Sequence, residues 1–122
     1  MSGQTHLILH TTVGNEADAQ TLARLAVEHH LAACVHIEAF QSVYRWQGQL
    51  QQDPEWRLAF KTTPHRLPDL LAQLKAAHPY ELPAFYTVPA IPATPEWDAW
   101  VEGRSEEHTS ELQSRQYLVC RL

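Results

Sequence analysis

The sequence has few of the residues that mark phosphate loops, disulfide frameworks and common catalytic motifs. Its four glycines are not clustered, so it has no glycine-rich cradle for a phosphate group, and GxSxG and HExxH motifs are absent. We therefore expect a protein that is not an enzyme. Its two cysteines, Cys34 and Cys120, predict neither a disulfide framework nor a CxxC zinc site. This cysteine usage favours a reducing cytoplasm.

Basic residues and long apolar runs are also scarce. The formal net charge is -5, and acidic and basic residues alternate along the chain without forming a basic stripe. Nucleic acid is therefore not an expected partner. No apolar run approaches the roughly 20 residues that a membrane span needs, and the first residues lack the basic region of a signal peptide. We expect a single cytoplasmic domain with no membrane partner.

Hydrophobic periodicity predicts four strands and three helices. Apolar residues alternate in the predicted strands and recur at helical spacing in the predicted helices. The order β-α-β-β-α-β with a short C-terminal helix is that of an α+β, ferredoxin-like sandwich. The expected strands are residues 5–13, 33–46, 56–62 and 85–91, and the expected helices are about 16–30, 64–77 and 95–101.

Polar and proline residues predict where these elements begin and end. Asn15 is expected to cap the first helix, the Thr63-Pro64 pair the second, and the Thr94-Pro95 pair the third. The polar segment 48–55 is expected to form the turn between the second and third strands. An irregularity is expected near Phe40, and Pro79 is expected to end the second helix.

Three aromatic residues, Tyr44, Trp46 and Trp56, lie in the predicted hairpin. Such residues are enriched at protein interfaces, so they suggest a surface that contacts another chain. They are equally able to fill the core of a single chain. Both interpretations stay open at this point.

The character of the sequence changes at Arg104. Residues 104–115 are polar and aperiodic, and they resemble the translation of a sequencing-library adapter. We therefore predict a domain at residues 1–103 and a non-native tail at residues 104–122. The alternative is a natural disordered tail, for which this composition is also typical. Cys120 is accordingly left out of any site.

Five separated stretches of the chain form a recognisable set. They are LAACV at 31–35, SVYRWQG at 42–48, Lys61-Thr62, HPYELP at 78–83, and residues 97–101. In this order and at these separations they resemble the CutA divalent-cation tolerance family, over about residues 5–103. The resemblance implies a ferredoxin-like protomer in a homotrimer, with long hairpins that wrap neighbouring subunits. It also implies a role in tolerance of or response to divalent metal ions, copper among them.

Three residues are the candidate metal ligands: Cys34, His78 and Glu81. Thiolate and imidazole groups suit copper and zinc, and the His78–Glu81 run places an imidazole and a carboxylate on one rigid turn. Cys34 is equally suited to be a packed, buried thiol. His78 is equally suited to bond a carbonyl at the end of the second helix.

The resemblance further implies an inter-subunit cleft to which Trp46, Lys61 and Tyr80 contribute. Thr11 stands where some members of the family have a further cysteine, so we expect modest metal affinity. Two other functions remain open. One is a signalling trimer that resembles the nitrogen-regulatory PII proteins and binds a small anionic ligand through Lys61 and Arg45. The other is a purely structural trimer.

Overall fold

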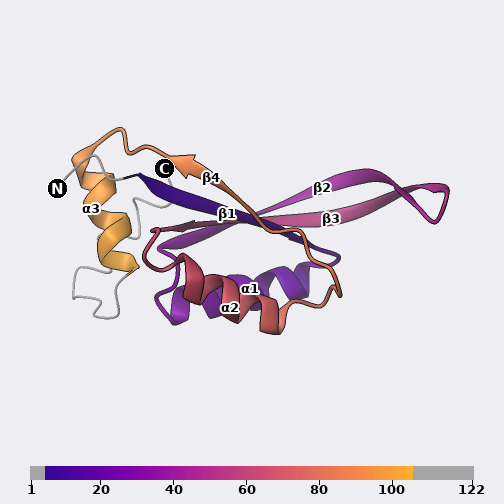
Figure 1. The fold of residues 1–122 in the computed structure, drawn as a ribbon, viewed down its shortest axis with the longest axis horizontal. Helices are drawn as coiled ribbons and strands as arrows, with labels where there is room; N and C mark the ends of the chain where they lie inside the picture. Colours follow the sequence, from indigo (N-terminus) through magenta and orange to yellow (C-terminus); the bar gives the residue numbers. More distant parts are fainter. Residues whose placement is uncertain (1–4, 106–122) are drawn as a thin grey trace.

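The structure is a computed structural model that describes residues 5–105. It contains the predicted order of four strands and two helices, followed by a third helix (Figure 1). The elements are β1 (His6–Val13), α1 (Glu16–Glu28), β2 (Cys34–Trp46), β3 (Gln49–Thr62), α2 (Leu67–Ala77), β4 (Tyr86–Ala90) and α3 (Pro95–Arg104).

The strands form one antiparallel sheet in the order β2-β3-β1-β4, which confirms the ferredoxin-like arrangement. In Figure 1, α1 and α2 lie against one face of this sheet, and α3 lies at the end where β1 begins. Because β3 is longer than β1, the far parts of β2 and β3 leave the sheet and project as a two-stranded ribbon. The molecule therefore has a packed body and an extended arm.

The core lies between the sheet and the two helices. The predicted stripe of α1 is buried, and the α2 stripe packs against it through Leu70 and Leu74. Leu9, Leu58 and Phe60 supply the sheet side and are inaccessible to solvent. Burying each of these side chains stabilises the fold by about 1.5–3 kcal/mol.

The predicted helix caps are mostly confirmed. The Asn15 side chain accepts a hydrogen bond from the Asp18 amide, and the Thr94 side chain accepts one from the Trp97 amide. The predicted start of α2 is wrong by three residues. Thr63 caps a preceding turn by accepting a bond from the Arg66 amide, so the helix begins after that turn.

The predicted turn at residues 48–55 is also wrong. The turn consists of Gln47 and Gly48, both with positive φ, and β3 resumes at once with Gln49 opposite Trp46. Positive φ at both central residues is the geometry of a two-residue hairpin turn. The segment is polar because it lies in the ribbon, where neither strand has a core to face.

The irregularity expected near Phe40 is absent. Phe40 pairs with Glu55, and Gln41 pairs with Pro54, in an unbroken register. The alternation weakens there because β1 ends opposite Trp56, so the next residues belong to the ribbon. The edge of β3 left open beyond β1 also accommodates Pro54, which has no amide proton to donate.

The folded part of the chain extends slightly beyond the predicted boundary at residue 103. Arg104 is the last residue of α3, and the buried Ser105 caps it by donating its amide proton to the Val101 carbonyl. The rest of the predicted tail lies outside the described residues. Among residues 5–105, no helix is long and apolar enough to cross a membrane.

Candidate functional site

An open groove of about 1030 Å³ lies where the ribbon leaves the sheet. One wall comes from the ribbon, and the other comes from the loop between α2 and β4. The loop is held there because Tyr80 reaches across to β3. The lining residues are Ser42, Val43, Tyr44, Trp46 and Glu55 from the ribbon, and Pro79, Tyr80, Glu81 and Leu82 from the loop.

The Glu55 carboxylate joins the two walls of the groove. One of its oxygens accepts a hydrogen bond from the Ser42 hydroxyl at 2.6 Å. The other accepts from the Tyr80 hydroxyl at 2.8 Å and, more weakly, from Thr12 at 3.4 Å. Hydrogen bonds to an ionised carboxylate are stronger than bonds between neutral groups. Glu55 therefore fixes the loop against the base of the ribbon.

Both tyrosines of the groove stay protonated over a wide pH range. Burial, and then the bond to Glu55, raise the pKa of Tyr80 far above its ordinary value. The hydrogen bond from the Tyr44 hydroxyl to Asp53, at 2.6 Å, raises the pKa of Tyr44. In each pair the phenol keeps its proton and donates it in a hydrogen bond to the carboxylate.

His78 lies behind the groove, and both of its ring nitrogens are bonded. Thr11 donates its hydroxyl proton to the Ala84 carbonyl, so its oxygen accepts from Nε2 of His78 at 3.1 Å. Nδ1 of His78 then accepts a proton from the Tyr80 amide. Burial lowers the pKa of His78, which fits this neutral form. Neither partner is a helix carbonyl, and a metal ion would have to displace one of these bonds.

Cys34 lies far from the groove. It is the first residue of β2, eight residues from Ser42, and eight strand residues span roughly 27 Å. It is buried in a small cluster with Ala33, Trp100 and Val101. The sulfur is disulfide-bonded, contrary to the expectation that the cysteines stay reduced. A disulfide sulfur is not the thiolate that binds metal ions.

Lys61 is also remote from the groove. It lies opposite Cys34, six residues along β3 from Glu55, which is roughly 20 Å. Its ammonium group donates to Nδ1 of His36 at 2.5 Å on the sheet face opposite α1 and α2, and burial lowers its pKa. Within one chain, the structure therefore brings together Trp46, Tyr80 and Glu81 but not Lys61.

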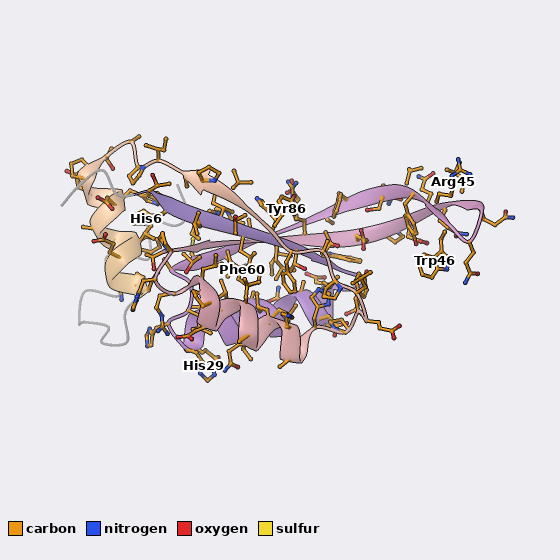
Figure 2. The ribbon with its side chains drawn as sticks, in the orientation of Figure 1. His6, His29, Arg45, Trp46, Phe60 and Tyr86 are labelled. Atoms are coloured by element: carbon orange, nitrogen blue, oxygen red, sulfur yellow. The ribbon has the colours of Figure 1, made fainter. Side chains whose placement is uncertain are left out.

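The three hairpin aromatics were open to two interpretations, filling the core of the single chain or contacting another chain, and the structure assigns them differently. Trp56 is half-buried and packs against the core. Tyr44 and Trp46 line the groove, and 61% of the Trp46 surface is exposed (Figure 2). The single chain therefore does not cover Trp46 with its own core.

Glu55 is a groove residue that the sequence pattern does not reveal, because the polar segment 48–55 resembles a turn. The signal that identifies it is the Gln47-Gly48 pair, because a two-residue turn there places Glu55 opposite Phe40 and on the ribbon. A second group of residues that the sequence pattern does not reveal is His6, Asp98 and Glu102, whose potential ligand atoms lie within 4.8 Å of one another. His6 on β1 and Asp98 on α3 are 92 residues apart, so no local sequence motif indicates that they are in contact.

The chemistry of the groove is aromatic and acidic. Two carboxylates, Glu55 and Glu81, and three aromatic rings line it, and no lysine or arginine is among the lining residues. Carboxylate oxygens and the faces of aromatic rings attract cations. The groove is therefore suited to a positively charged ligand and poorly suited to an anion.

Known proteins resemble this chain in sequence and in fold. The model of the family described as CutA1 divalent ion tolerance protein matches residues 7–104. The divalent-cation tolerance protein CutA of Thermus thermophilus is 42% identical over 91 residues, covering 74% of this chain and 88% of the relative. The protein of the same name from Thermotoga maritima is 34% identical over 95 residues, covering 78% and 94%.

The solved structure of CutA from Synechococcus elongatus has the same fold. It superimposes with a TM-score of 0.82 at 38% sequence identity. The match covers 87% of this chain and 95% of the other. The similarity therefore includes the sheet, the helices and most of the described residues.

Proposed function

The chain belongs to the CutA1 divalent ion tolerance protein family, and from this premise we propose that it binds copper or a similar divalent cation as a homotrimer. Membership of the family supports a role in tolerance of divalent metal ions. The observation that carries the proposal of direct binding is the acidic and aromatic groove at the base of the ribbon. Its lining also argues against an anionic ligand of the PII type, because no basic side chain contributes to it.

Assembly is supported by apolar side chains that the single chain leaves uncovered. Val43, Trp46 and Leu50 are all exposed on the ribbon, Leu50 by 72%. On the sheet face opposite α1 and α2, Tyr86 is exposed as well (Figure 2). Val88, two residues further along β4 on the same face, is also exposed. Contiguous exposed apolar surface is typical of protein interfaces. A homotrimer covers both surfaces if the ribbon of one subunit lies against its neighbour.

Light scattering tests the assembly. We expect a mass of three times the 13.9 kDa of one chain. Replacing Trp46 and Leu50 by serine removes apolar surface from the ribbon only, and we expect it to shift the mass toward that of one chain. Replacing the exposed Val27 of α1 by serine is the control, because α1 takes no part in the proposed contacts. A mass of 13.9 kDa for the unmodified protein contradicts the homotrimer.

The proposed metal ligands remain Cys34, His78 and Glu81, and we propose an order of importance among them. Glu81 comes first, because it lines the groove and its carboxylate has no hydrogen-bond or ion-pair partner among residues 5–105. His78 comes second, because metal binding must break its bond to Thr11 or to the Tyr80 amide. Cys34 comes last, because its disulfide must first be reduced. Because it lies far from Glu81 and His78 in the same chain, it would bind a second ion or an ion shared with another subunit.

Calorimetric titration with copper(II) tests this order. We expect Glu81→Gln to weaken binding roughly tenfold, a loss of about 1.4 kcal/mol. Glu28→Gln is the matched control, since it removes one exposed carboxylate at the end of α1 that is remote from Gly14 and Tyr80. Cys34→Ser is compared with the unmodified protein before and after reduction, and His78→Gln completes the series. Unchanged copper binding in all three variants excludes the assignment.

Two further parts of the proposal concern the whole chain. We propose a cytoplasmic location, which cell fractionation with an antibody to the protein tests. We also propose that residues 104–115 derive from a sequencing adapter and that the tail at residues 104–122 replaces the natural end of the protein. Resequencing the 3′ end of the gene tests this directly, and a coding sequence that retains these codons contradicts it.

A further inference from the structure

A cluster of three potential metal ligands lies at the end of the molecule opposite the ribbon. Asp98 and Glu102 are one helical turn apart on α3, so their side chains project from the same face. His6, the first residue of β1, lies beside that helix (Figure 2). One ligand atom from each of the three residues lies within 4.8 Å of the other two. Among residues 5–105, no other group of three such side chains is this close.

Two members of the cluster are almost completely buried. His6 is 1% exposed and Asp98 is 4% exposed. Nε2 of His6 and a carboxylate oxygen of Asp98 are 2.7 Å apart, which ties α3 to β1. The edge of the Trp97 ring packs against the imidazole with 5.8 Å between ring centroids. Buried ionisable groups of this kind are normally either paired or bound to a metal ion.

The contacts within the protein do not satisfy this cluster. Nδ1 of His6 is buried and has no hydrogen-bond partner, which costs about 1–3 kcal/mol. The Glu102 carboxylate is half-buried, and no hydrogen bond or ion pair joins it to any residue in the described part of the chain. A second carboxylate beside a buried aspartate is unfavourable unless a positive charge lies between them.

The ligand types indicate which ion satisfies the cluster. One imidazole nitrogen and two carboxylate oxygens suit zinc and similar divalent transition ions, and the absence of sulfur disfavours copper(I). Two ligands on one zinc ion lie at most about 4.4 Å apart, twice a bond of about 2.2 Å. The potential ligand atoms of the cluster all lie within 4.8 Å of one another, which is close to this limit.

We propose that His6, Asp98 and Glu102 form a binding site for a divalent transition-metal ion such as zinc. The site uses three protein ligands and leaves the remaining positions to water. It is separate from the groove, since His6 and Thr12 are six residues apart on β1, or roughly 20 Å. It does not depend on the function proposed for the groove. A bound ion joins α3 to the sheet through charge as well as through the His6–Asp98 bond.

The simpler interpretation is that His6 and Asp98 form a structural bond and that Glu102 is a bystander. Glu102 separates the two interpretations, because Glu102→Gln removes one ligand and leaves the His6–Asp98 bond intact. Glu96→Gln is the matched control, since Glu96 is an exposed carboxylate in the first turn of the same helix. Asp98→Asn tests the second ligand while keeping an oxygen that accepts from His6.

The experiment is a titration of the full metal-free chain, without an affinity tag, with zinc chloride in a calorimeter. All variants carry Glu81→Gln, so that metal binding at the groove does not contribute to the signal. The result for the His6 cluster is then independent of whether the groove binds metal. We expect one zinc ion per chain, weakened about tenfold or more by Glu102→Gln and Asp98→Asn but not by Glu96→Gln. We also expect zinc to raise the melting temperature of the control and not of Glu102→Gln.

A crystal grown with zinc locates the ion independently through its anomalous scattering. A peak within bonding distance of ligand atoms from His6, Asp98 and Glu102 supports the site. The proposal is overturned if the Glu102→Gln and Glu96→Gln proteins bind zinc equally, or if the ion lies elsewhere. The comparison of Glu102→Gln with Glu96→Gln is decisive, because it does not depend on whether the Asp98→Asn protein folds.

Discussion

The two ends of the β2–β3 hairpin differ in what surrounds them. Near β1, the side chains of Leu58 and Phe60 are inaccessible to solvent and contact α1 and α2. In the ribbon, the same two strands continue with unbroken pairing, yet Trp46 and Leu50 are exposed. Backbone pairing and a few side-chain hydrogen bonds therefore maintain the ribbon, while apolar packing maintains the body. The body specifies the fold, and the ribbon leaves apolar side chains exposed.

The largest expected effect separates these two ends by substitution. Phe60→Ala removes a buried ring and should destabilise the chain by about 3–5 kcal/mol in urea denaturation. Trp46→Ala should change the unfolding free energy of the separated chain by less than about 0.5 kcal/mol, because Trp46 has little of the chain's own surface to lose. An equal loss for both variants at dilutions where the protein is a single chain would remove the distinction.

The second effect concerns the bond that joins the body to the groove. Thr11→Val keeps the shape of a buried side chain but leaves Nε2 of His78 and the Ala84 carbonyl without their partner. We expect a loss of about 1–3 kcal/mol in the free energy of unfolding. Thr12→Val is the control, because Thr12 makes only a long bond of 3.4 Å to Glu55. A loss no larger than that of the control would show that the loop is held without Thr11.

The third effect is a pH dependence that arises in the body. Burial lowers the pKa of His78 and of His10 below 6.5, and for His10 the charges of Arg57 and Lys61 lower it further. Below about pH 6.5 the unfolded chain binds protons that the folded chain does not, so stability is greatest above that pH and declines as the pH falls toward the folded pKa values.

Urea denaturation at about pH 8 and about pH 5 measures this decline. His78→Gln should reduce the difference between the two conditions, and His10→Gln should reduce it again. The ribbon contains no histidine, so Trp46→Ala should leave the difference unchanged. A decline that persists in the double histidine variant would assign it to other groups.

The smallest effect compares two residues with positive φ. His30 follows α1 with a φ of 57°, and Gln47 lies in the ribbon turn with a φ of 52°. Replacing either by glycine relieves backbone strain of about 1 kcal/mol. We expect His30→Gly to raise the global unfolding free energy and Gln47→Gly to slow amide exchange only within the ribbon. A global gain from Gln47→Gly would mean that the ribbon unfolds together with the body.

The secondary structure of the body could be predicted from the sequence, because the spacing of its apolar residues matches the buried faces of its helices and strands. The α1 stripe, the alternation from Trp56 to Thr62 and the caps at Asn15 and Thr94 all reflect contacts within a few residues or with one core. The ribbon could not be predicted in detail, because residues such as Gln51 and Asp53 face solvent on a strand. Because the ribbon strands have no buried face, they lack the alternation of apolar and polar residues, and their sequence resembles that of a polar turn.

The groove could be predicted in part. Trp46, Tyr80 and Glu81 were expected together and line one groove. Glu55 was missed because its role depends on the hairpin register. Cys34 and Lys61 lie elsewhere because strand length, which the sequence does not reveal, separates them from the ribbon. The cluster of His6, Asp98 and Glu102 depends on contacts between the two ends of the domain and leaves no mark on local sequence.

The central position of β1 has a consequence for synthesis of the protein. One edge of β1 pairs with β3 and the other with β4, and His6 contacts Asp98, a residue 92 positions later. At about 5–20 residues per second, a ribosome needs on the order of ten seconds to make the intervening chain. During that interval the first strand has no neighbour on one side. A chaperone that holds nascent strands would therefore act on this protein at its amino-terminal end.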